Sequence, residues 1–349
     1  MKQKILFLLT LLVASVGTQA KSWKIGPSSV TGMDFASINA AMSSSNVSAG
    51  DTLYLDQYFS TNVVQAVTKK VVIIGTGYDT SFSDEQVVAT LTDSLKLMVD
   101  GIQVKSVRLA NVKFFADECT LNRCYTAAIT IGTVPKSINH IYSCYITGTV
   151  GNRVVASSTV SYNGSTTNTY ANAQFDIQNC VFKTTNRYVV QYLTNSIINN
   201  NTIHSTYGSG TYCLNLIDNT LITNNLIYQT GGSSLSSDVY AVNSGNSIEH
   251  NIINQSVPAT YPNNKNGSLT VCNQTGNYSD YYKLKTNVTD NYALTYATDG
   301  GEVGCHGGMF GCPSGGRPQY IPYFTKVTVG SRTENGKLPV SVTIKIQDE

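Results

Sequence analysis

The hexad Ile198-Asn-Asn-Asn-Thr-Ile203 decides the fold, because it returns as Ile222-Thr-Asn-Asn-Leu-Ile227 and as Ile248-Glu-His-Asn-Ile-Ile253. Positions one and six are large and apolar, and strict strand alternation would place them on opposite faces. The chain must therefore bend inside each copy, which predicts a strand, a turn and a second strand. Position three is Asn, Ser or His, residues that suit the left-handed backbone of a tight bend.

Further copies of the hexad are spread along the chain. They are Leu109–Phe114, Ile141–Ile146, Ile177–Phe182 and a decayed copy at Leu269–Gln274, with an early unit at Val71–Gly75. Successive starts from Leu109 are 32, 36, 21, 24, 26 and 21 residues apart. A repeat of 21 to 26 residues is one coil of a three-stranded solenoid. We expect the two longer gaps to carry inserted loops, at 115–140 and 147–176.

Position four predicts a ladder of side chains. Successive rungs of a sheet stack about 4.8 Å apart, so equivalent residues form a column. Asn201, Asn225 and Asn251 occupy this position, and each buried amide can bond to the rungs above and below. Cys144 and Cys180 occupy the same position earlier, and we predict free, structural thiols there. Cys272 is predicted to share the column.

The other cysteines allow a different interpretation. Eight cysteines suggest disulfides if the chain is exported. Cys119 with Cys124, and Cys305 with Cys312, are close enough in sequence to close small surface loops. We treat both pairs as candidate disulfides.

The asparagine ladder resembles that of the right-handed parallel β-helix, or pectin-lyase-like, family, over residues from about 30 to 310. Residues 33–42 and 48–55 look like the family's capping helix and first strand, with Asp34 as a helix cap. Residues 299–308 are similar to the closing segment of exported bacterial members. The stretches 324–329 and 338–346, around Glu334-Asn-Gly336, predict a β-hairpin.

These features give an expected organisation of three parts. Residues 1–20 are a signal peptide, 21–310 a β-helix domain, and 311–349 a C-terminal β-hairpin cap or appendage. The expected fold class is all-β: a right-handed single-stranded parallel β-helix (solenoid) with an N-terminal capping helix and a C-terminal hairpin.

The first twenty residues predict export. Lys2 and Lys4 precede an apolar run from Ile5 to Val16, and Thr18-Gln-Ala20 places small residues at a cleavage site. We expect a Sec-exported bacterial protein that is secreted, periplasmic or on the cell surface. No later segment has the apolar length of a membrane span.

Charge and composition narrow the partners. Charged residues are 13% of the chain and the net charge is +2, too little to argue for nucleic acid or acidic membranes. The polar, uncharged surface and the 22 Tyr suit glycans, although a long β-fold also favours Tyr and Thr. We expect a monomer.

The family contains polysaccharide lyases and hydrolases alongside binding proteins and adhesins, so fold alone does not choose a function. The resemblance implies that catalytic groups would face outward from the strand before each hexad. We counted residues back from the hexads at Ile198 and Ile222 along the preceding strand. Strand alternation then predicts that the side chains of Gln191 and Asn215 point outward, and that those of Tyr192 and Leu216 point inward. The outward set has no charge, and the paired Asp, Gly-His-Gly and Arg-rich loops of the family's enzymes are missing. A lyase would require Ca²⁺ held by carboxylates, and no other cofactor is expected.

One residue past each hexad stand Lys183, His204, Tyr228 and Asn254, a predicted outward column that could stack and hydrogen-bond along a glycan. It could equally be a polar outer face. The leading interpretation is an exported protein that contacts extracellular polysaccharide by binding rather than cleavage. The alternatives are a divergent polysaccharide lyase or glycoside hydrolase, and a structural or adhesin-type surface protein.

Overall fold

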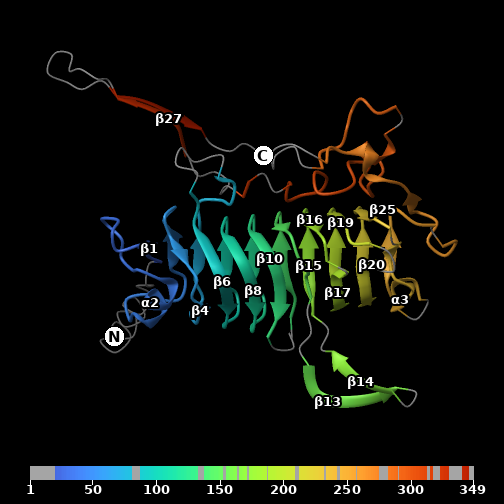
Figure 1. Ribbon diagram of the computed structural model, residues 1–349, viewed down its shortest axis with the longest axis horizontal. Coiled ribbons are helices and arrows are strands. Elements are labelled where there is room, and N and C mark those ends of the chain that lie inside the picture. Colours follow the sequence, from blue (N-terminus) through green and yellow to red (C-terminus); the bar gives the residue numbers. More distant parts are fainter. Residues whose placement is uncertain are drawn as a thin grey trace, which may run out of the picture.

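The chain folds into a parallel β-helix (Figure 1). The computed structural model describes residues 20–316, except 81–86, 133–136, 152–154, 163–164, 171–172, 187, 209–211, 232, 242–243, 257, 275–281, 290 and 313–314, together with strands 323–329 and 340–345. The predicted signal peptide therefore lies almost wholly outside the described residues.

One face of the coil is a ten-stranded parallel sheet in which each strand adds one rung. Its strands, in order, are β1 (Ser22–Ile25), β2 (Thr52–Leu55), β5 (Val72–Ile74), β7 (Gln103–Lys105), β9 (Thr120–Asn122), β11 (Asn139–Tyr142), β15 (Phe175–Gln178), β18 (Ile197–Asn199), β21 (Leu221–Thr223) and β24 (Ser247–Glu249).

A second face is an eleven-stranded parallel sheet, and later coils add a third face of three strands. The eleven strands are β3 (Ser60–Thr61), β4 (Gln65–Val67), β6 (Thr90–Leu97), β8 (Arg108–Phe114), β10 (Tyr125–Ile131), β12 (Tyr145–Ile146), β16 (Val181–Thr184), β19 (Thr202–Ser205), β22 (Leu226–Gln229), β25 (Ile252–Ile253) and β26 (Lys265–Asn266). The third face contains β17 (Tyr188–Thr194), β20 (Tyr212–Asp218) and β23 (Ser233–Leu235).

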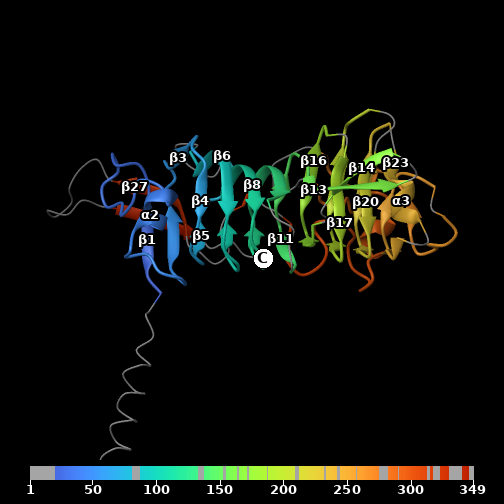
Figure 2. The same cartoon turned by 90° about the horizontal axis from the view of Figure 1, so that it is seen from below.

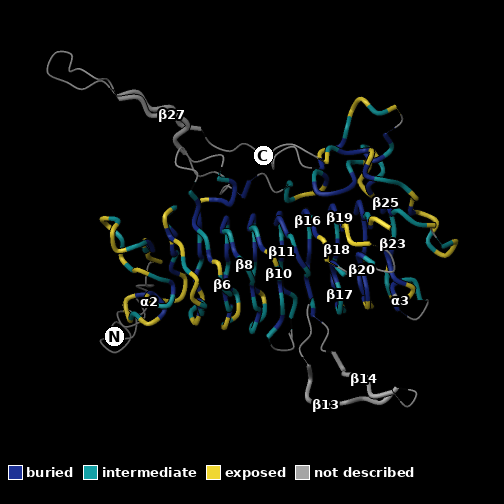
Figure 3. Tube along the Cα trace, viewed as in Figure 1, coloured by how far each residue is buried: buried dark blue, intermediate teal, exposed yellow. Residues whose placement is uncertain are grey.

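The bend between the first two faces has the predicted left-handed backbone. Position three has φ between 50° and 57° at Ser143, Asn179, Asn200, Asn224 and His250. Position one, on the strand before the bend, supplies a file of buried Ile and Leu to the interior, and buried residues recur along the strands (Figure 3). The apolar interior and the left-handed corner together define each rung.

The asparagine ladder is present, as predicted. The Oδ1 atom of Asn225 accepts from the backbone N–H of Asn201 at 2.8 Å and from its Nδ2 at 3.0 Å. Asn251 Oδ1 likewise accepts from the backbone N–H and from the Nδ2 of Asn225, each at 2.9 Å. Each Nδ2 also donates to a carbonyl of the preceding rung, Ile198 O for Asn225 and Ile222 O for Asn251. These amides are fully buried and all their polar atoms are paired.

The ladder is longer than predicted at both ends. Asn264 continues it beyond Asn251, accepting from the Asn251 N–H at 3.0 Å. In the other direction the Cys180 N–H donates to Asn201 Oδ1, and the Cys144 N–H donates to Cys180 Sγ. The Tyr145 N–H bonds to Cys124 O just as the Val181 N–H bonds to Cys144 O, which places Cys124 in the same column.

The placement of Cys272 in this column was wrong. The predicted copy at Leu269–Gln274 begins instead as a short 3₁₀ helix, η3 (Leu269–Val271). Cys272 belongs to a second cluster of buried residues outside the coil, together with Tyr282 and Cys305. Asn264, only 13 residues after Asn251, takes the ladder position because the last coil is shortened.

The first hexad was also placed in the wrong register. Leu109 pairs with Thr126, which pairs with Ile146, so Leu109 occupies position six rather than position one. The true copy nearby is Leu121-Asn-Arg-Cys-Tyr-Thr126, whose Leu121 aligns with Ile141. Its Thr at position six hides the apolar pattern. Residues 115–140 are thus not simply an inserted loop, because they contain β9 and β10.

The candidate disulfide between Cys119 and Cys124 is not formed. The two thiols are free and lie at opposite ends of β9. Three extended residues span about 10 Å, beyond the Cα separation that a disulfide allows. Cys119 Sγ donates to Val99 O, and Cys124 Sγ donates to Val104 O. Burial raises the pKa of Cys119 to about 11, so it is held as the thiol.

The additions to the coil are partly as expected. The N-terminal helix is short, α2 (Ile38–Ser43), and Ser37 caps it, whereas the predicted cap Asp34 accepts from the Lys24 N–H instead. Residues 147–176 do contain an insertion, the antiparallel pair β13 (Val155–Tyr162) and β14 (Ser165–Tyr170). This hairpin projects below the coil in Figure 1, and in Figure 2, seen from below, its strand β14 lies across the later coils near β20.

The predicted C-terminal hairpin is confirmed as the antiparallel pair β27 (Tyr323–Val329) and β28 (Val340–Lys345). Its predicted turn, Glu334-Asn-Gly336, lies outside the described residues. The remaining described helices are α3 (Ser237–Tyr240) and the 3₁₀ helix η4 (Tyr292–Leu294).

Residues 296–316, here called the strap, run back along the coil instead of closing its end (Figure 1). Their contacts follow the position-three residues in reverse order, starting with Tyr296 O at 2.8 Å from His250 Nδ1. Asn224 Nδ2 then bonds to Thr298, and Asn200 Nδ2 bonds to Glu302 O.

The strap continues to the early rungs. Asn179 Nδ2 donates to Cys305 O at 3.0 Å and also to Gly307 O. Ser143 Oγ lies 2.8 Å from Phe310 O, and the Tyr78 N–H donates to Gly315 O. The polar side chains of the left-handed corner therefore form a docking line for the strap.

Replacing Asn225 with Ala tests the ladder. The substitution leaves the Asn201 N–H and the Ile198 and Thr223 carbonyls without their partner in a buried site. We expect the free energy of unfolding to fall by about 3 kcal/mol, measured by denaturant titration. Asn46→Ala, at an exposed position, is the matched control and should change it by less than about 0.5 kcal/mol. Equal losses for the two variants would contradict the ladder.

Candidate functional site

The outer face of the ten-stranded sheet is lined by two files of side chains. Between them runs the inward file that includes Ile141, Ile177, Ile198, Ile222 and Ile248. The strand register from β9 to β24 gives file one as Thr120, His140, Asp176, Ile197, Leu221 and Ser247, and file two as Asn122, Tyr142, Gln178, Asn199, Thr223 and Glu249. The strap lies beside file two, at the ends of the same strands.

The densest polar cluster of this face joins β11 to β15. Tyr142 Oη lies 2.5 Å from Asp176 Oδ2 and 2.7 Å from His140 Nδ1. Gln178 Nε2 donates to Asp176 Oδ1 at 2.7 Å. On its other side the Tyr142 ring stacks on Phe310 of the strap, with centroids 4.1 Å apart. The strap thus fixes the orientation of the tyrosine.

Proton counting assigns the hydrogen bonds of the cluster. A tyrosine hydroxyl has one hydrogen, and the carboxylate of Asp176 is its stronger acceptor. Tyr142 therefore donates to Asp176, and the Nδ1–H of His140 donates to Tyr142. With Nδ1 bonded to Tyr142, Nε2 is the ring nitrogen that remains for a further contact, on a side chain that is 28% exposed.

The charge states of the cluster follow from its contacts. Burial opposes ionisation of Asp176, but hydrogen bonds from His140, Tyr142 and Gln178 outweigh it and hold the pKa of this carboxyl below its ordinary value. Burial and the neighbouring Asp176 raise the pKa of Tyr142. At neutral pH the cluster therefore holds a carboxylate, only 7% exposed, beside a neutral phenol.

Amide and hydroxyl groups continue file two beyond this cluster. Asn199 Oδ1 accepts from Thr223 Oγ1 and from Asn224 Nδ2, each at 3.0 Å. Asn199 Nδ2 donates to Gln178 at 3.4 Å. The file is a row of mutually oriented donors and acceptors, partly open to solvent.

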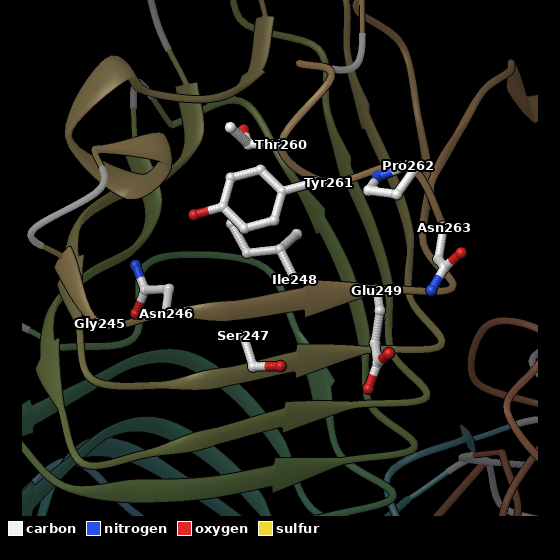
Figure 4. A pocket seen from close by; sticks show the side chains of 9 residues that line it. All are labelled: Gly245, Asn246, Ser247, Ile248, Glu249, Thr260, Tyr261, Pro262 and Asn263. Carbon is white, nitrogen blue, oxygen red and sulfur yellow. The ribbon is translucent and has the colours of Figure 1, made fainter.

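A pocket of about 310 Å³ ends the face, between β24 and residues 260–263 (Figure 4). Ser247 and Glu249 project from one side of β24, and the Tyr261 ring lies over Ile248. The pocket is lined by carboxylate, amide, hydroxyl and aromatic groups together, a mixture that suits a hydroxyl-rich ligand.

The predicted column of Lys183, His204, Tyr228 and Asn254 is only partly what the sequence indicated. Lys183, His204 and Tyr228 do align in register. However, the C-terminal segment covers His204, which is 8% exposed and bonds through Nδ1 to Tyr282 Oη at 2.8 Å. Asn254 bonds to the backbone of Gln229. The open polar face lies on the other sheet.

Gln191 and Asn215 stack in register as predicted, but Asn215 is buried rather than outward. Tyr192 and Leu216, predicted inward, have φ of 57° and 52°, and Leu216 is 39% exposed. This left-handed residue in each strand shifts the alternation by one, so Leu193 and Ile217 are buried instead. The predicted directions of these side chains were wrong because they assumed regular alternation along the whole of each strand.

One group of metal-type ligands is found among the described residues: Cys305, His306 and Cys312. Thiolate and imidazole are not ligands that Ca²⁺ favours, so this group does not supply the calcium site expected for a lyase.

No helix in the described part of the chain has the length and apolar character needed to cross a membrane.

Comparisons with protein-family models, with curated proteins and with solved structures give no match for this chain. The function must therefore be argued from the geometry of the site.

The buried His204 predicts a pH dependence of stability. Burial, and secondarily Lys183, lowers its pKa from 6.5 to about 4. Between about pH 4 and 6.5 His204 is protonated in the unfolded chain but neutral in the folded chain, so a lower pH favours unfolding. Stability is thus complete above about pH 6.5 and falls by up to about 3 kcal/mol as the pH drops to about 4.

Denaturant titrations between pH 4 and 7 measure this dependence. His204→Gln should remove the part of the slope that belongs to this group, whatever the variant's stability at neutral pH. Parallel pH curves for the variant and the natural protein would contradict the assignment.

Proposed function

We propose that this chain is an exported protein that binds a glycan along the outer face of the ten-stranded sheet. The observation that carries the proposal is the polar file two together with the cluster of Tyr142, Asp176 and His140, whereas file one is apolar at Ile197 and Leu221. Strands repeat about every 4.8 Å, a spacing comparable to one sugar unit, so successive rungs can offer equivalent contacts to successive residues of a chain.

The charges of the face favour an uncharged or amino-sugar glycan. Asp176 and Glu249 are the carboxyl groups of the two files from β9 to β24, and the nearest Lys or Arg in register is Lys105 on β7, one rung before Asn122. A polyuronate would place its carboxylates against Asp176, whose depressed pKa keeps it charged. Neutral hydroxyls or an ammonium group would instead find acceptors.

Carboxylate spacing supports binding rather than hydrolysis. Glycoside hydrolases place two carboxyl groups at most about 9.5 Å apart. Asp176 on β15 and Glu249 on β24 are separated by three strand steps, which corresponds to about 14 Å. The two carboxyls of the face are therefore too far apart to act on one glycosidic bond.

Residues 1–20 support export, because a basic start is followed by an apolar run and by small residues before Lys21, as in a signal peptide. Extracellular glycans are the hydroxyl-rich polymers that an exported protein meets. The pocket beside β24 would then receive one end of the bound chain or a branch.

Glycan-array retention, followed by titration with the retained polysaccharide, tests the proposal. Retention of neutral or amino glycans is expected, without release of reducing ends or unsaturated uronates. Gln178→Ala should weaken binding by about 10-fold, since it removes a hydrogen bond worth about 1.4 kcal/mol. Gln57→Ala, in the turn after β2, is the matched control and should bind normally.

Each alternative gives a distinct result. Turnover of a polysaccharide would replace the proposal with a lyase or hydrolase. Absence of retention on every glycan would leave a structural or adhesin-type role.

A further inference from the structure

The eight thiols of the chain fall into two groups. Six donate to a backbone carbonyl, and each of these lies in a buried position: Cys119, Cys124, Cys144, Cys180, Cys213 and Cys272. Within the described residues, Cys305 and Cys312 have no such bond to a carbonyl. Both thiols are free, so the candidate disulfide between them is not formed in this structure, and their Sγ atoms face each other at 2.9 Å. These two thiols are therefore not accounted for by packing in the same way as the others.

A histidine completes the group. The ligand atoms of Cys305, His306 and Cys312 all lie within 4.8 Å of one another. Cys305 is buried, whereas His306 and Cys312 are partly exposed. One side of the cluster is therefore held inside the protein and the other can be reached from solvent.

The backbone around Cys305 is fixed by the coil. The Cys305 N–H donates to Thr202 Oγ1 at 3.1 Å, and its carbonyl accepts from Asn179 Nδ2. Gly307 follows, where a Cβ atom would lie 1.8 Å from Glu302 O. The loop can pass there only without a side chain. Its position is set by folding, before any ligand arrives.

We propose that Cys305, His306 and Cys312 form a binding site for a zinc-type metal ion, with two thiolates and one imidazole as protein ligands. Thiolate and imidazole are the preferred ligands of Zn²⁺, which takes them in a tetrahedral arrangement. Three protein ligands leave a fourth position for water or an external ligand.

The geometry requires only a small adjustment. With Zn–S bonds of about 2.3 Å, two sulfurs of a tetrahedral site lie about 3.8 Å apart. The Sγ atoms must separate by slightly less than 1 Å from their present 2.9 Å, and the partly exposed Cys312 can move. Binding converts two thiols and a Zn²⁺ ion into a dithiolate complex and releases two protons.

The site would join the strap to the rungs beneath it. Cys305 and His306 are adjacent in the strap, on the loop that Asn179 and Thr202 hold, and Cys312 lies farther along it next to the Ser143 contact. A bound ion would close this segment on itself and stabilise the native state in proportion to its affinity.

Zinc titration of the reduced full-length protein, in competition with a chromophoric chelator, tests the proposal. One equivalent of Zn²⁺ should bind, and Co²⁺ should give thiolate-to-metal charge-transfer absorption. Cys312→Ser and His306→Gln should each weaken Zn²⁺ binding by more than about 100-fold. Cys213→Ser, which removes a buried thiol elsewhere, is the control and should bind as the natural chain does.

Folding of each variant is checked by circular dichroism, and His306→Gln keeps the result interpretable if a cysteine variant misfolds. Unchanged Zn²⁺ affinity in His306→Gln would overturn the site. So would a Cys305–Cys312 disulfide in protein whose free thiols are blocked at harvest, because that bond consumes both thiolates.

Discussion

The hydrogen bond from one rung's backbone N–H to the next rung's Asn Oδ1 is the interaction on which the structure depends. It places Asn201, Asn225, Asn251 and Asn264 in one buried column and fixes the register of the sheets on both sides. A slip of one residue would bury position three and expose position four, leaving several amides unpaired in an apolar interior. Cysteine substitutes for Asn in the earlier rungs because a small thiol fits the slot and its S–H reaches a carbonyl.

The left-handed corner has a second consequence. Position three must point away from the interior, so successive rungs present Arg123, Ser143 and then Asn or His at the same edge. The strap pairs with these groups one after another. Together with buried residues from the segment 269–293 it forms a second apolar cluster with the first residues of strands β12, β16, β22 and β25 of the eleven-stranded sheet. The outer face of the ten-stranded sheet stays more open, with the strap beside it. The same repeat that builds the coil therefore also determines the edge along which the strap packs.

The sequence predicted the parallel coil, the left-handed bend and the central ladder, because these depend on local residue type repeated at a fixed period. It failed where the repeat is degenerate, as at Leu121–Thr126, whose Thr126 breaks the apolar signal. The prediction also failed at Tyr192 and Leu216. One left-handed residue inside a strand shifts the alternation, so the side chains after it point to the opposite face from the one predicted.

Contacts between distant segments were beyond reach of the sequence. The proximity of His204 to Tyr282, and of Tyr142 to Phe310, depends on the path of the strap and of the segment before it. For this reason the predicted glycan column was partly covered, and the cluster of His140, Tyr142 and Asp176 was missed. Spacing alone gave one hint: His140 and Tyr142 alternate on a strand, and Asp176 lies 36 residues after His140, the same offset as between the hexads at Ile141 and Ile177.

Native-state hydrogen exchange at the ladder tests the central claim most directly. The backbone N–H groups of Asn201, Asn225 and Asn251 donate to side chains rather than to a sheet partner, in a bend where exchange would otherwise be fast. If the buried column holds the rungs together, these three amides exchange only through global unfolding, as slowly as the strand amides beside them. Exchange at the rate of an exposed turn would contradict the account.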